Sequence, residues 1–229
     1  MNNTPINLRV KFKKVGSLQY ISHLDLVRTM HKIVVRAKLP LWYTEGFNPK
    51  PKLVFGAPLS IGAESVTEFL DIRLTEKMDP KEAIEALNRN LTDEMSVLDA
   101  YYTAAPFTDM KWMSYTICIK TAAASSRLAE ECTRILLGES VVVEKKTKSG
   151  GFATVDIRPL IKSADSVLDG DIIKISCVLS ADPSAFLNPE YAVKALKGAL
   201  GILSDPILTN EYYTIMRECA YTADMSEFV

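Results

Sequence analysis

The sequence predicts an α+β protein of two halves, each built in the order strand, helix, strand, strand, helix, strand. Three observations lead to this prediction: apolar residues alternate in some segments, recur at helical spacing in others, and the two kinds of segment follow the same order twice. The length of 229 residues suits one large domain or two small ones. With 48% hydrophobic and 24% charged residues, the composition excludes collagen-like, disordered and disulfide-scaffold chains.

The first half opens with an alternating segment over residues 6–14, which predicts a strand with one apolar and one cationic face. Ser22 is the expected N-cap of a helix over residues 23–38, and Pro40 ends this helix. The negative charge of Asp25 in the first turn interacts favourably with the positive end of the helix dipole. The other predicted elements of this half are a short strand over 53–55, a strand over 66–74, a helix over 79–90 with proline at its first position, and a strand over 97–102.

Residues 105–109 form a predicted linker between an N-terminal domain of residues 1–105 and a C-terminal domain of residues 110–229. The predicted elements of the second half are strands over 115–120, 141–145, 153–157, 172–179 and 207–216, and helices over 126–137 and 189–200. Here the strand over 153–157 is an addition to the order of the first half.

A match between the halves supports duplication. Residues 79–88 align with residues 188–197, where the proline, two alanines and a leucine coincide and an Asx residue precedes each proline. Chance agreement of two amphipathic helices is the alternative. The order β-α-β-β-α-β is the ferredoxin-like plan, so the predicted fold class is α+β with tandem ferredoxin-like domains.

Several function classes find no support. No apolar run is long enough to span a membrane, and the N-terminus lacks the apolar block of a signal peptide, so we expect a cytoplasmic protein with no membrane partner. The four cysteines share no short spacing and are expected as buried, reduced side chains rather than metal ligands. Phosphate-binding, dinucleotide-binding, serine-hydrolase and zinc-protease motifs are missing, so we expect no metal and no cofactor.

Charge is distributed unevenly although the net charge is only −1. Residues 1–52 hold ten cationic and two acidic side chains, a net +8, whereas residues 53–107 hold four and ten, a net −6. A local basic segment indicates a site for a polyanion. The alternative is that the acidic segment folds back and neutralises it.

A first candidate site surrounds the start of the first helix. It comprises Tyr20, Ser22, His23, Asp25, Arg28 and His31. In the first helical turn the positive end of the dipole favours a neutral His23 imidazole, which could act as a general base with Tyr20 as its partner. The alternative is a structural role for the histidine. Arg28, Lys32 and Arg36 recur every fourth residue on the arc opposite the apolar one and form a predicted cationic stripe.

A second candidate site is the irregular segment 39–52, in which cations and aromatics share a proline-stiffened loop. Cations suit phosphates and aromatic faces suit bases, so this pairing indicates nucleic acid. The alternative is a rigid connector whose aromatics fill the core. Gly46 allows a turn, and the candidate RNA-binding residues are Arg28, Lys32, Arg36, Phe47, Asn48, Lys50 and Lys52. We expect one pocket to hold Tyr20, His23, Asp25, Arg28, Phe47, Asn48 and Lys52.

Residues 9–16, 20–26, 36–40 and 46–52 resemble the uncharacterised bacterial family of radical-SAM-linked proteins. The resemblance implies a radical S-adenosylmethionine protein as a fused or neighbouring partner, and a genetic context of ribonuclease and ribosomal-protein genes. Lys50 stands where the family pattern commonly shows histidine. A looser similarity, at the level of architecture, is to the CRISPR repeat-cleaving RAMP endoribonucleases, which cut RNA without metal.

Three functions follow as hypotheses. The first is a non-catalytic RNA-binding module that presents tRNA or rRNA to a radical-SAM modifying partner. The second is a metal-independent endoribonuclease with His23 as base, Tyr20 as its partner, and Arg28 or Lys50 stabilising the charged transition state. The third is a protein-interaction scaffold without a nucleic-acid role.

Overall fold

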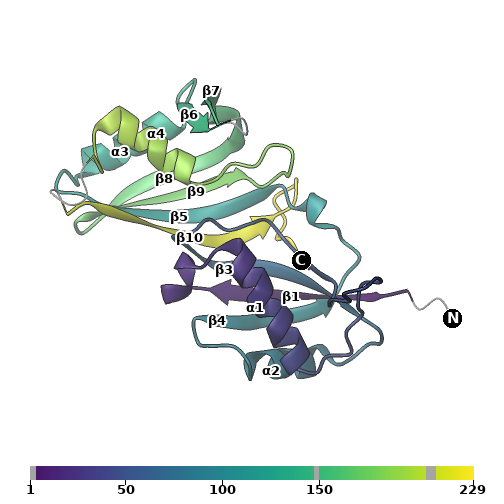
Figure 1. Cartoon of the computed structure of the whole chain (residues 1–229). Coiled ribbons are helices and arrows are strands. Elements are labelled where there is room, and N and C mark those ends of the chain that lie inside the picture. Colours follow the sequence, from purple (N-terminus) through teal and green to yellow (C-terminus); the bar gives the residue numbers. More distant parts are fainter. Residues whose placement is uncertain (1–3, 147–149, 205–209) are drawn as a thin grey trace. The chain divides into compact units, whose positions relative to one another are not determined.

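A computed structural model describes residues 4–146, 150–204 and 210–229. The described residues form an α+β fold with four α-helices and mainly antiparallel strands (Figure 1). The chain divides into two compact units: unit 1 is Met1–Phe107 with Val229, and unit 2 is Thr108–Phe228. Within the described ranges, none of the helices combines the length and the apolar character that crossing a membrane requires.

Unit 1 contains its elements in the predicted order. They are β1 (Ile6–Lys14), the short 3-10 helix η1 (Gly16–Tyr20), α1 (His23–Arg36), β2 (Leu53–Phe55), β3 (Ala63–Leu74), α2 (Pro80–Asn88) and β4 (Met95–Tyr102). The strands lie in the order β4-β1-β3-β2, and each pair of neighbours is antiparallel. The central β1 pairs with β3 and β4 on its two sides, so its alternating residues define the two faces of the sheet.

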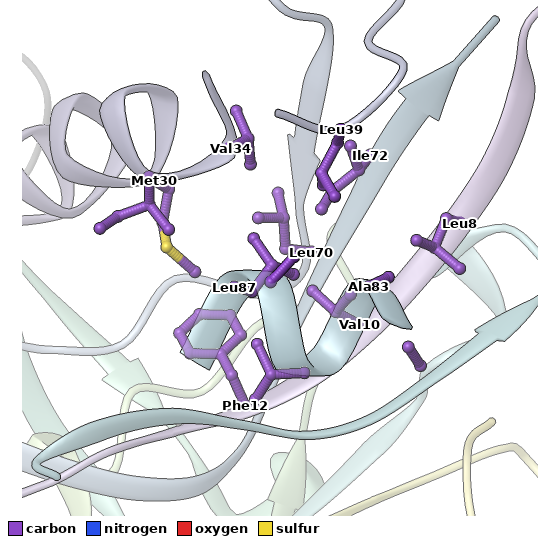
Figure 2. Close-up of a cluster of buried hydrophobic side chains, with 14 of the residues drawn as sticks. Leu8, Val10, Phe12, Met30, Val34, Leu39, Leu70, Ile72, Ala83 and Leu87 are labelled. Atoms are coloured by element: carbon purple, nitrogen blue, oxygen red, sulfur yellow. The ribbon is translucent and has the colours of Figure 1, made fainter. Parts of the chain in front are cut away.

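The apolar residues that predicted the strand and the helix meet in one core (Figure 2). Leu8, Val10 and Phe12 of β1 are completely buried, and α1 and α2 contribute their apolar arcs to the same cluster. Its helical members are Leu26, Met30, Ile33, Val34, Ala83, Ala86 and Leu87. Each large apolar side chain buried here stabilises the fold by about 1.5–3 kcal/mol. The cationic arc of α1 is therefore on the side of the helix that faces away from the core.

Unit 2 comprises β5 (Trp112–Lys120), α3 (Ser126–Leu136), β6 (Val142–Lys146), β7 (Phe152–Asp156), β8 (Ile161–Asp169), β9 (Ile172–Ser180), α4 (Glu190–Leu200) and β10 (Tyr212–Tyr221). Its strands lie in the order β10-β5-β9-β8, again antiparallel. The helices α3 and α4 lie side by side on one face of this sheet (Figure 1). β6 and β7 pair with each other in a separate two-stranded sheet.

The strands of unit 2 depart from the predicted order in two ways. The strand predicted over 141–145 is β6, but it belongs to the separate hairpin and not to the main sheet. The place beside β9 is taken by β8, which the sequence did not predict because polar residues occupy most of its positions and its pairing is irregular near Ile161. The last strand, expected over 207–216, extends over Tyr212–Tyr221, and residues 207–209 of that prediction lie outside the described residues.

The first of the two matched helices begins as predicted, with Asp79 as its N-cap, whereas the expected cap Asn188 lies one residue before the N-cap of the second. The Asp79 carboxylate accepts a hydrogen bond of 2.9 Å from the amide of Lys81, and Pro80 is the first helical residue. The Asn188 side chain accepts one of 3.0 Å from the amide of Glu190, and Pro189 is the N-cap. In each case an Asx side chain accepts from an amide that has no partner within the helix.

Candidate nucleic-acid interface

The start of α1 is capped as the sequence predicts. The Ser22 hydroxyl accepts a hydrogen bond of 3.1 Å from the amide of Asp25 and donates one of 2.7 Å to the Asp25 carboxylate. The hydroxyl, and then the nearby Arg28 guanidinium 3.4 Å away, hold the pKa of Asp25 below its usual value. This exposed carboxylate therefore stays ionised and stabilises the helix through its interaction with the positive end of the helix dipole.

His23, the candidate general base, is exposed, and its ring lies edge-on against the ring of Phe55 with centroids 5.5 Å apart. Tyr20, its candidate partner, is also exposed. Among the described residues no hydrogen bond joins the two side chains. His31 is half-buried, and its Nδ1 lies 2.8 Å from the carbonyl oxygen of Val27, so that nitrogen carries the proton. His23 thus contacts β2 and His31 its own helix, and the catalytic roles of His23 and Tyr20 stay a prediction.

The cationic stripe (Arg28, Lys32, Arg36) is exposed along the outer arc of α1. Successive members are four residues apart, so they rise by about 6 Å along the helix axis. Leu24 and Val35 are exposed on the same side of the helix. The only ion pair of the stripe in the described structure is that of Arg28 with Asp25, and both partners are exposed, so the pair is weak. A phosphate group can therefore reach these three cations.

The segment between α1 and β2 is a hairpin-like loop rather than an irregular connector. The amide of Thr44 donates to the carbonyl of Lys50 at 2.9 Å, and the amide of Lys52 donates to the carbonyl of Trp42 at 3.1 Å. We call residues 45–50 the loop tip. At the tip Gly46 has a φ of 122°, in the region that favours glycine. This backbone conformation explains why a glycine occupies the turn.

The loop tip presents an aromatic ring to solvent. Phe47 is fully exposed and makes no contact with the core. Asn48, Lys50 and Lys52 are exposed as well, and the Lys52 ammonium lies 5.5 Å from the centre of the Trp42 ring. The alternative that the loop aromatics fill the core does not apply to Phe47.

The structure brings some of the candidate residues together and not others. Ser22, Asp25 and Arg28 form one connected group, whereas no hydrogen bond, ion pair or ring contact among the described residues joins His23 to Phe47 or Asn48. Five hollows of the described structure are lined by residues of unit 2. The predicted shared pocket stays a prediction.

Two of the ten cations of the basic segment are buried in unit 1. The Arg9 guanidinium binds the Asp71 carboxylate through two nitrogens, at 2.7 and 3.1 Å, and lies 4.2 Å from the centre of the Phe107 ring. The Lys14 ammonium donates to the carbonyl of Leu18 at 3.0 Å. The acidic segment, residues 53–107, therefore neutralises Arg9 through Asp71, as one interpretation of the charge pattern expects. The cations of the stripe and the loop tip stay exposed, as the polyanion interpretation expects.

A match to a protein family adds to this geometry. Residues 7–189 match the family described as an uncharacterized protein conserved in bacteria, DUF2344. The chain belongs to the DUF2344 family. The match covers all of unit 1 from β1 onward, including the stripe and the loop tip. In this DUF2344 protein no three His, Cys, Asp or Glu side chains of the described ranges gather into a group that could hold a metal ion.

Solved structures show remote likeness. A chain in the crystal structure of a Cbf5-Nop10-Gar1 complex is 9% identical, with 93% of the DUF2344 chain and 48% of that chain covered and a TM-score of 0.49. A chain of the archaeal box H/ACA sRNP Nop10-Cbf5 complex is 11% identical, with 92% of the DUF2344 chain and 46% of that chain covered and a TM-score of 0.44. An unknown protein from Galdieria sulphuraria is 9% identical, with 93% of the DUF2344 chain and 99% of that protein covered and a TM-score of 0.28. The DUF2344 chain thus spans about half the length of the first two, and no curated protein is similar to it at a significant level.

Proposed function

We propose that unit 1 binds RNA, and that the protein presents tRNA or rRNA to a radical-SAM partner that modifies it. The observation that carries the proposal is Phe47, a fully exposed aromatic ring at a loop tip held by hydrogen bonds and flanked by exposed lysines. A phenylalanine outside any core leaves apolar surface in water, which is unfavourable unless a partner covers the ring. An unpaired base covers such a ring by stacking.

The cations around the ring supply the second half of an RNA contact. Lys50 and Lys52 lie on the same loop as Phe47, and the stripe of α1 adds three more exposed cations. Lysine and arginine bind phosphates whatever the sequence, and thereby position the strand whose bases stack on aromatic rings. Pro49 and Pro51 restrict the loop before binding, so less conformational entropy is lost when RNA orders it.

The architecture supports a duplicated origin of the two units. The strand orders β4-β1-β3-β2 and β10-β5-β9-β8 correspond when β8 takes the place of β2, with the hairpin β6-β7 as an insertion. We infer tandem ferredoxin-like domains over residues 1–105 and 110–229, of which the first is the RNA-binding one. A cytoplasmic location and the radical-SAM partner belong to the same proposal. They are supported by the resemblance of residues 9–52 to radical-SAM-linked proteins.

Replacing Phe47 tests the proposal. The variant F47A removes the stacking ring from an exposed position and so leaves the core intact, and Phe152→Ala, at another exposed phenylalanine in unit 2, is the matched control. Because stacking of one base on an aromatic ring contributes about 1–3 kcal/mol, F47A should weaken binding of a single-stranded RNA at least fivefold and F152A should not. Fluorescence anisotropy at low salt measures both. Equal affinities of the wild type and F47A would refute the stacking role of Phe47.

A further inference from the structure

Unit 2 contains a hollow of about 640 Å³ between α4 and the start of β10, which we call the α4–β10 hollow. Its volume falls within the range of about 300–1,000 Å³ that small-molecule sites occupy. Among the residues that line it are Glu190, Tyr191, Lys194, Lys197, Tyr212 and Tyr213. Three tyrosines, two lysines and two glutamates line the hollow, and nothing in the proposed role of unit 1 accounts for them.

Tyr191 of α4 and Tyr213 of β10 form what we call the tyrosine wall of the hollow. The Tyr213 hydroxyl donates a hydrogen bond of 2.7 Å to the Glu190 carboxylate, which holds the ring in place. Burial, followed by the hydrogen bond with Glu190, raises the pKa of Tyr213 to about 12, so the hydroxyl remains a neutral donor near pH 7. Tyr212 also lines the hollow, but strand alternation turns its ring to the sheet face opposite that of Tyr213.

The cations lie at the rim of the same wall. Lys197 is exposed one helical turn after Lys194, whose ammonium donates to the carbonyl of Glu144 at 2.6 Å. The Lys145 ammonium lies 5.5 Å from the centre of the Tyr191 ring. Lys145 and Lys194 therefore lie where α4 meets the β6-β7 hairpin.

The acidic residues of the hollow are already engaged. Glu211 is buried and accepts hydrogen bonds from the Thr121 hydroxyl and, at 2.6 Å, from the amide of Leu203. Glu190 accepts from Tyr213. Both carboxylates therefore accept from protein donors, whereas Lys197 is exposed to an anion in solvent.

We propose that the α4–β10 hollow binds a nucleoside phosphate, with the base against the tyrosine wall and the phosphate on Lys197 and Lys194. A base needs an aromatic face, a phosphate needs cations, and residues of both kinds line the hollow. This site is separate from the proposed RNA contact of unit 1, and it stands if that contact fails. The nucleoside phosphate could come from a free nucleotide or from a residue within an RNA strand.

Isothermal titration calorimetry with adenosine 5′-monophosphate tests the proposal on the full chain. Adenosine 5′-monophosphate should bind at least tenfold more tightly than either adenosine or ribose 5-phosphate, because each fragment keeps only one half of the contact. Tyr191→Ala should weaken binding roughly 5- to 150-fold, the loss expected for one stacked base, whereas Tyr191→Phe should retain it. Lys197→Gln should weaken it about tenfold, and Lys174→Gln, at an exposed lysine of β9, should leave it unchanged.

A competing pentaadenylate distinguishes the two sources. If it displaces the mononucleotide and binds more than about tenfold more tightly, the hollow holds one residue of an RNA, and if it does not, the ligand is a free nucleotide. Either result supports the site. No binding of adenosine 5′-monophosphate, or equal losses in Tyr191→Ala and Tyr191→Phe, or in Lys197→Gln and Lys174→Gln, would overturn it. Loss of RNA binding in F47A with retained mononucleotide binding would separate this site from that of unit 1.

Discussion

At the scale of single residues, Gly16 has two reasons to be glycine. Its φ is +62°, and a Cβ built on it would lie 2.3 Å from the Glu94 carboxylate, which already accepts hydrogen bonds from the amide and hydroxyl of Ser17. We predict that Gly16→Ala lowers the thermal stability of unit 1, because the left-handed backbone alone costs a non-glycine residue about 1–2 kcal/mol and the displaced carboxylate adds to this. Circular dichroism melting measures the change.

The matched control is Gly62→Ala in the same unit. Gly62 also has a positive φ, of 87°, but a Cβ there meets nothing within 4 Å. This variant bears the backbone cost without the contact, so Gly16→Ala should melt at the lower temperature. Equal melting temperatures would show that Glu94 moves aside freely.

The Arg9 side chain shows what sequence reasoning missed at this scale. Strand alternation correctly assigned Arg9 to the face opposite Leu8 and Val10, and the charge count then grouped it with the exposed cations. Its partner Asp71 is 62 residues away, and alternation alone cannot say which strand lies next to β1. A buried bidentate pair of this kind is visible only once the pairing of β1 with β3 is known.

At the scale of elements, the helices were predicted well because each carries both a periodic apolar arc and an end signal. Ser22 and Asp79 accept from the amides that their positions imply. Strand β8 was missed because exposed polar side chains dominate it, a pattern that an edge strand shares with a loop. The hairpin-like loop over 39–52 was predicted as a functional segment, but its backbone ladder was not, because proline and glycine conceal strand alternation.

The stripe of α1 carries the prediction that belongs to this scale. Reversing it in the variant R28E/K32E/R36E should abolish RNA binding at moderate salt without unfolding the helix, since all three side chains point away from the core. Each phosphate contact contributes about 0.7–0.9 to the slope of log affinity against log salt, so at low salt the slope should fall by about two to three.

The control reverses charge on the other helix of unit 1. Lys81 and Arg89 are exposed on or directly after α2, so K81E/R89E changes the net charge of the unit without touching the stripe. Anisotropy titrations at several salt concentrations compare the variants. A slope that falls equally in both would mean that only the net charge of the unit matters, and an unchanged slope in the first would make the stripe a solvated helix face.

At the scale of the whole molecule, periodicity and turn residues predicted the order of elements in unit 1 and the α+β class, because those depend on short-range patterns. The candidate site was reached only in part: the exposure of Phe47 and of the stripe agrees with a nucleic-acid contact, whereas the α4–β10 hollow was not anticipated. The residues that line this hollow come mainly from a helix and a strand and are separated along the sequence, so no sequence motif predicted the hollow.

The cysteines give a prediction for the folded chain as a whole. All four are free, and burial raises the pKa of Cys132 to about 11 and that of Cys177 to about 12, while Cys118 and Cys219 are partly exposed. Only the thiolate reacts with a disulfide reagent, so at about pH 8 the two partly exposed thiols of the native protein should react first. Cys132 and Cys177 should react only when unit 2 opens, and concentrated urea should release all four to react at similar rates. Time-resolved labelling followed by peptide mass spectrometry measures each site, and native labelling of Cys177 as fast as that of Cys118 would mean that the sheet of unit 2 opens readily around β9.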